Sequence, residues 1–134
     1  MAILSEVISW LSGGGHNGSR PYKNRTAALE ALFAETEKNL EALTGSSIPS
    51  SAAFDLLNGQ LDLLKDSNGT AFAVQNAYGQ VHSYIDTIKQ YEQLPPEEKS
   101  RQYRTFVENL TVQQGQLSET LAQLKRRLKT ARNS

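Results

Sequence analysis

Apolar residues recur along most of this chain at intervals of three and four positions, the spacing of a buried helix face. The sequence offers no useful length of the alternating apolar and polar pattern that a half-buried strand would show. The pattern therefore predicts an all-α fold. We expect a helical bundle of three long helices and one broken short helix, preceded by a tethered amphipathic helix at the N-terminus.

Three seams with heptad-like spacing define the long helices. The first helix is predicted with Pro21 as a first-turn residue, an apolar seam that starts at Tyr22 and a C-cap at Gly45. The second covers about residues 70–93, and the third opens at Pro96 after a proline pair that ends its predecessor. The seams consist of Tyr22, Thr26, Leu29, Phe33, Thr36, Leu40 and Leu43, then Ala71, Val74, Tyr78, Val81, Ile85 and Ile88, then Tyr103, Val107, Leu110, Gln114, Leu117, Leu121, Leu124 and Leu128.

The segment between the first two long helices is predicted to be broken. A short helix is expected over residues 52–58, and Gly59 interrupts it before one or two further turns over residues 60–65. The run from Asp66 to Gly69 has the composition of a turn that starts a helix. Apolar residues of this segment are expected to close one side of the bundle, and they are Phe54, Leu56, Leu57, Leu61 and Leu64.

The first twelve residues carry the sharpest apolar signal. Three consecutive glycines begin at position 13, so residues 1–12 are predicted to be an amphipathic helix and residues 13–21 a flexible tether to a bundle over residues 22–131. This helix could dock on its own chain, on a protein partner or a second copy, or on a membrane surface. Its candidate contact residues are Ile3, Leu4, Val7, Ile8, Trp10 and Leu11.

Composition excludes several classes of protein. The 134 residues suit one domain, and the chain has no cysteine, which removes disulfides, thiolate metal sites and cysteine nucleophiles. No apolar run approaches the roughly 18 residues of a transmembrane helix. The N-terminal segment has no basic start and no small-residue cleavage site, so it is a poor signal peptide. We expect a cytoplasmic protein, with a peripheral place at the membrane as the alternative.

The net charge is zero but unevenly distributed. Residues 46–99 hold three cations and seven acids, whereas residues 100–134 hold seven cations and two acids. Cations near a helix C-terminus stabilise its dipole, and the same cluster could instead bind an anionic lipid, an acidic partner or nucleic acid. The cluster is Lys125, Arg126, Arg127, Lys129 and Arg132.

Residue patterns that carry chemistry are weak. His82 and Asp86 share a helix face one turn from Tyr78, but no distinctive nucleophile accompanies them. Glu30, Glu37 and Glu41 form a carboxylate row that is typical of a solvated helix face. No catalytic residue, metal site, cofactor or small-molecule ligand is therefore predicted, and nucleic acid is not favoured as a partner.

Three further positions leave alternatives open. Gln114 is the polar residue in the last seam, where it either specifies register or reaches water at the edge. Gly79 and Gly115 lie inside predicted helices, where close helix approach or sequence drift would explain them.

Residues 25–91 resemble a group of uncharacterised prokaryotic helical domains. The resemblance is carried by RTAALEALFAETEKNLEAL, then AAFDLLNGQLDLLKD, then AYGQVHSYIDTI. Such domains often follow an N-terminal transmembrane segment, and residues 1–12 are too short for one. The resemblance implies a regulatory or scaffolding role near a membrane. Together, these observations predict a non-enzymatic interaction or assembly module that binds a protein partner or itself through apolar helix faces.

Overall fold

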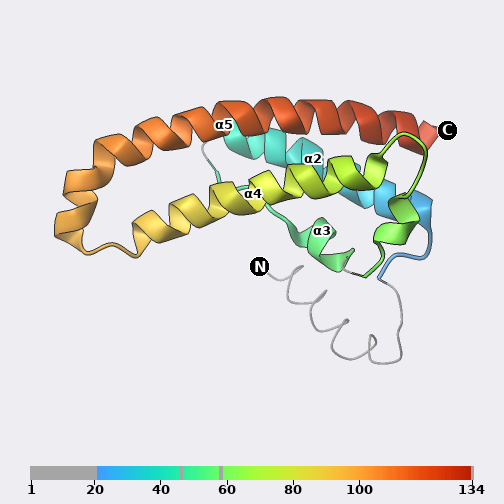
Figure 1. The fold of residues 1–134 in the computed structure, drawn as a ribbon, viewed down its shortest axis with the longest axis horizontal. Helices are drawn as coiled ribbons and strands as arrows, with labels where there is room; N and C mark the ends of the chain where they lie inside the picture. The colour runs from blue at the N-terminus through green and yellow to red at the C-terminus, as the bar shows by residue number, and fades with distance from the viewer. Residues whose placement is uncertain (1–20, 46, 58, 134) are drawn as a thin grey trace.

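The computed structural model describes residues 21–45, 47–57 and 59–133, and these contain helices and no strand (Figure 1). The all-α prediction is confirmed for this part of the chain. Three long helices, α2 (Arg25–Thr44), α4 (Thr70–Glu92) and α5 (Pro96–Asn133), are joined by the short helix α3 (Ala52–Leu56) and the 3-10 turn η2 (Leu61–Leu64). The helix and tether predicted over residues 1–12 and 13–20 lie outside the described residues.

Helix α5 organises the molecule, because it packs against both α2 and α4. The core is made by the stripes that the sequence indicated. Leu29, Leu32 and Leu43 of α2 are buried, as are Val74, Tyr78 and Val81 of α4. The C-terminal half of α5 contributes Leu117, Leu121, Leu124 and Leu128. Below this core, Leu57 and Leu64 close one side, as predicted for the broken segment.

The start of α2 differs from the prediction. The helix begins at Arg25, because the side chain of Asn24 accepts a hydrogen bond from the Ala27 N–H at 2.9 Å and acts as the N-cap. Pro21 and Tyr22 therefore precede the helix, although Tyr22 is still buried. Thr26, predicted as a seam residue, is exposed. The seam was extended one turn too far, because the buried Tyr22 has the apolar character that the pattern detects.

Tyr22 instead joins the chain before α2 to the broken segment. Its hydroxyl donates to the carbonyl of Ala53 at 2.8 Å, and its backbone exchanges two hydrogen bonds with the side chain of Gln60. Burial, with a smaller contribution from the carboxylate of Glu35, raises the pKa of Tyr22 to about 12. These contacts fix the broken segment beneath α2.

The turn before α4 is built as the sequence indicated. One oxygen of the Asp66 carboxylate accepts the backbone N–H groups of Asn68 and Thr70, both at 3.0 Å, while the other accepts the Thr70 hydroxyl. Gly69 has a φ of 73°, which favours glycine. Arg25 donates to Asp66 at 2.8 Å and to the carbonyl of Leu63 at 3.0 Å. The hydrogen bonds from Thr70, followed by that from Arg25, hold the pKa of Asp66 well below its usual range.

Candidate interaction surface

Helix α5 is much longer than α2, so at one end of the described fold α4 and α5 extend without α2 beside them. In Figure 1 the hairpin formed by α4 and α5 extends to the left past the end of α2. We call residues 85–112 the hairpin end: the last turns of α4, the connection, and the first turns of α5. It is the part of the described fold in which α4 and α5 pair beyond the end of α2.

Gln114 marks the position at which α2 stops. Its side-chain amide donates a hydrogen bond to the carbonyl of Leu43, in the last turn of α2, and it is partly buried there. This carbonyl is one of those that a helix C-terminus leaves without an intrahelical partner. The polar residue in the seam therefore satisfies the end of a neighbouring helix within the same chain, a role that neither sequence-based interpretation included.

The apolar seam of α5 does not stop at Gln114. On the side covered by α2 and α4, Leu117 is 1% exposed. On the N-terminal side of Gln114, past the end of α2, Leu110 is half-buried, Val107 is 39% exposed and Tyr103 is 61% exposed. The helical spacing of the seam is confirmed, but within the described fold Tyr103 and Val107 are exposed. The physical reason is that α2 is too short to reach them.

Contacts within the hairpin end nevertheless hold α4 and α5 together. The rings of Tyr91 and Phe106 stack with centroids 4.0 Å apart, and the Tyr91 hydroxyl donates to the carbonyl of Lys99 at 2.9 Å. Next to these rings, a shallow hollow of ≈ 370 Å³ is lined by Tyr91, Lys99, Ser100 and Tyr103. Tyr103 belongs to both the exposed seam and this hollow, so the two form one surface whose apolar part is the seam.

The surface carries little net charge. Residues 85–112 hold five acidic and four basic side chains. Two of them pair locally, because Arg101 and Glu98 form an ion pair of 2.7 Å on the same helix. A mixed, nearly neutral surface is unsuited to the strong single-sign attraction that nucleic acid or anionic lipid exploits.

The predicted basic cluster is divided between different faces of α5. Lys125 pairs with Glu37 of α2 at 3.2 Å, and both Lys125 and Arg132 lie over the ring of Phe33. Arg127, by contrast, donates to the carbonyl of Asn68 on the α4 side. Arg126 and Lys129 are exposed. Three of the five cations thus have contacts within the chain that hold α5 to its neighbours, and binding of an anionic partner stays the alternative interpretation of the cluster.

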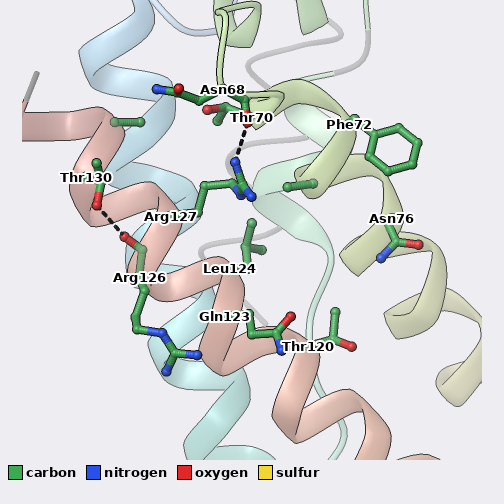
Figure 2. A pocket seen from close by; sticks show the side chains of 12 residues that line it. Asn68, Thr70, Phe72, Asn76, Thr120, Gln123, Leu124, Arg126, Arg127 and Thr130 are labelled. Atoms are coloured by element: carbon green, nitrogen blue, oxygen red, sulfur yellow. Dashed lines mark hydrogen bonds between the residues drawn. The ribbon is translucent and has the colours of Figure 1, made fainter.

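A groove of ≈ 800 Å³ lies between the start of α4 and the end of α5. Figure 2 shows Arg127 reaching across it to Asn68, while Arg126 and Phe72 point outward on opposite sides. The walls between them are mainly short polar side chains, including Asn76, Thr120 and Gln123. The two arginines do not converge in this groove, so it offers less than the hairpin end as a candidate site.

The residues considered for catalysis have other contacts. His82 lies 3.7 Å from the carboxylate of Asp55, and its ring forms a T-shaped contact with Phe54, which stacks on Tyr78. The buried Tyr78 hydroxyl donates to Glu35 at 2.7 Å. Tyr78 is thus part of the core, and the contact of His82 with Asp55 joins α4 to α3.

Glu35 is the centre of a buried polar network that the sequence pattern did not reveal. Its second oxygen accepts hydrogen bonds from the Ser50 hydroxyl and the Ala53 N–H, each at 3.0 Å. Asn39, one turn further along α2, exchanges two bonds of 2.8 Å with the backbone of Ser50. Their positions could have indicated burial, because Glu35 immediately precedes Thr36, a predicted seam residue, and Asn39 follows it by three residues.

Other predicted residues lie apart from these features. Glu30, Glu37 and Glu41 are exposed, as expected of a solvated face. Within the described ranges, no three histidine, aspartate or glutamate side chains gather where they could hold a metal ion. None of the helices described combines the length and apolar character needed to cross a membrane. The candidate contact residues from Ile3 to Leu11 lie outside the described residues.

Comparison with known proteins adds no relationship to these observations. No protein-family model matches the chain, and no curated protein or solved structure is significantly similar to it.

Proposed function

We propose that this protein is a non-enzymatic interaction module that binds a protein partner through an apolar helix surface at the hairpin end. The observation that carries the proposal is the seam of α5, which continues past α2 with Tyr103 and Val107 exposed. Such a stripe normally packs against another helix, because apolar side chains on one helix face are stabilised when they are removed from water. Helix-in-groove and helix-on-helix recognition use this type of surface.

Two features of the structure support the proposal. The stacking of Tyr91 on Phe106 holds the surface in place before binding, which reduces the entropy lost on association. The hollow beside Tyr103 gives the surface a concave part that can receive a side chain of the partner. A cytoplasmic location fits this role.

A matched pair of substitutions tests the proposal. Val107 and Val112 are both exposed on α5, but only Val107 belongs to the seam. The wild-type chain, Val107→Glu and Val112→Glu are each immobilised and used to capture proteins from a cell extract. We expect at least one protein to be retained by the wild type and by Val112→Glu, and to be lost from Val107→Glu. Equal capture by all three proteins would contradict the proposal.

Membrane association is separated from this function by a second measurement. If the N-terminal apolar segment bound lipid, the full-length chain would float with anionic liposomes in a salt-sensitive way, and Ile8→Asp would not. Our proposal predicts no flotation for either protein. Flotation that depends on Ile8 would favour a peripheral membrane protein instead.

A further inference from the structure

We infer that the hairpin end binds the hairpin end of a second copy of this chain, forming a symmetric dimer with Val107 near its twofold axis. The inference rests on the proposed function and names the partner. In such a dimer, α4 and α5 of each copy pack on those of the other, so that two open two-helix ends become one closed four-helix arrangement.

Continuity with the α2 interface is the first reason. In the described fold, the α5 seam from Leu117 to Leu128 is buried by the other helices, whereas the seam from Tyr103 to Leu110 continues beyond the end of α2. The spacing does not change where α2 ends, so the surface beyond Gln114 suits the same kind of neighbour, an apolar helix. A second copy supplies helices that carry this seam.

The charge pattern is the second reason. A surface with an excess of one sign would repel a copy of itself, but the hairpin end mixes five acids with four cations. In a symmetric dimer the same patch faces itself, so near-neutrality removes the main electrostatic obstacle to self-association.

Size is the third reason. The α5 part of the hairpin end has a length of about 25 Å, and two adjacent helices, each about 10 Å wide, then present roughly 500 Å² per copy. The sum for two copies, about 1,000 Å², lies at the lower limit for a specific interface. We therefore expect a reversible dimer with a dissociation constant in the micromolar range.

Sedimentation equilibrium of the full-length chain tests the dimer over about 1–500 µM. The wild type is expected to change from the 14.8 kDa monomer to twice that mass as concentration rises. Val107→Glu should weaken the dimer by at least about 100-fold, since each interface would bury two carboxylates at its centre. Val112 also lies in the hairpin end, but about 140° around α5 from Val107, so Val112→Glu should stay within about threefold of the wild type. Circular dichroism establishes that both variants are folded.

Cross-linking tests the geometry independently. The chain has no cysteine, so Val107→Cys introduces a single thiol. Two copies of this variant should form a disulfide-linked dimer on mild oxidation, whereas Arg126→Cys, far from the proposed axis, should not.

Several results would overturn the inference. A wild-type chain that is monomeric at 500 µM excludes the dimer, although capture of another protein that depends on Val107 would still support the proposed function. A dimer that survives Val107→Glu, or fails to cross-link through Val107→Cys, places the interface elsewhere. If Ile8→Asp alone dissociates that dimer, its interface involves the N-terminal segment instead. Loss of both the dimer and any Val107-dependent capture would remove the proposed function as well.

Discussion

At the scale of single residues, the interior depends on one buried carboxylate. Glu35 of α2 accepts hydrogen bonds from Tyr78, Ser50 and the backbone of Ala53. Its two oxygens therefore connect α2 to α4, to α3 and to the loop that precedes α3. All buried side-chain nitrogen and oxygen atoms among the described residues have a hydrogen-bond partner. A satisfied network of this kind specifies how elements fit together, and breaking one bond leaves a buried group without compensation.

Tyr78→Phe tests this network. The substitution removes the hydroxyl that donates to Glu35 and leaves one carboxylate oxygen buried without that donor. We expect the free energy of unfolding, measured by urea titration, to fall by about 1–3 kcal/mol. Tyr84→Phe is the control, because the described residues give the Tyr84 hydroxyl no hydrogen bond, and it should change stability by less than about 0.5 kcal/mol. Equal effects of the two substitutions would contradict the role of the network.

The same variant has a signature in alkaline solution. Burial, followed by the nearby carboxylate of Glu35, raises the pKa of Tyr78 far above its usual value, and Tyr22 is raised to about 12. The folded state therefore holds these phenolic protons more tightly than the unfolded state does, in which the pKa of tyrosine is about 10. The resulting stability is fully present below pH 10 and is lost as pH rises through the folded pKa values. Tyr78→Phe should show a shallower decline above pH 10.

At the scale of elements, the helix ends follow local rules. Asn24 caps α2, Gly45 follows its last residue as predicted, and Pro96 opens α5 with two glutamates in the first turn. The two glycines inside long helices need another interpretation. A Cβ atom added at Gly79 or Gly115 would meet no atom within 4 Å, so close helix approach does not explain either glycine.

Replacing these two glycines should stabilise the protein. Gly79→Ala and Gly115→Ala each add a methyl group in open space and reduce the freedom of the unfolded chain. We expect each to raise the free energy of unfolding by about 0.5–1 kcal/mol in urea denaturation. Gly69→Ala provides the contrast, because its φ of 73° strains an alanine, and it should lower stability. No gain at either helical position would show that these glycines have a role in the fold.

At the scale of the whole molecule, the unequal lengths of the helices create the candidate site. Helix α5 has 38 residues and α2 has 20, so the first turns of α5 pack beside α4 past the end of α2. Side chains in these first turns contact fewer neighbours, so local unfolding there exposes less apolar surface to water and costs less free energy. The surface that we propose to be functional is therefore also expected to be the less stable end of α5.

Hydrogen exchange should reveal this difference. At low micromolar concentration, backbone amides of residues 100–112 should exchange faster than those of residues 117–131, as measured by mass spectrometry of peptides. Uniform protection along α5 would mean that the helix opens as one unit and that the hairpin end is no weaker than the core.

Within the described residues, the sequence alone predicted the three long helices apart from the start of α2, because spacing, prolines and capping residues act over one or two turns. It also supplied most of the core, since Leu29, Val81 and Leu121 belong to stripes that any packing of these helices would bury. The last seam is longer than the other two, which indicated that α5 could extend past its neighbours. The seam alone does not determine which of its residues are buried. Which part of a stripe is covered depends on where the neighbouring helix ends in space.

Only the tertiary structure decided the remaining features. Glu35 and Tyr78 are 43 positions apart, and Gln114 and Leu43 are 71 apart, so no local pattern can pair them. The same limit applies to the basic residues near the C-terminus, which follow one another in sequence but divide between α2 and the turn before α4. A helix turns by about 100° per residue, so neighbours in sequence face different partners, and the packing of other helices decides which contacts form.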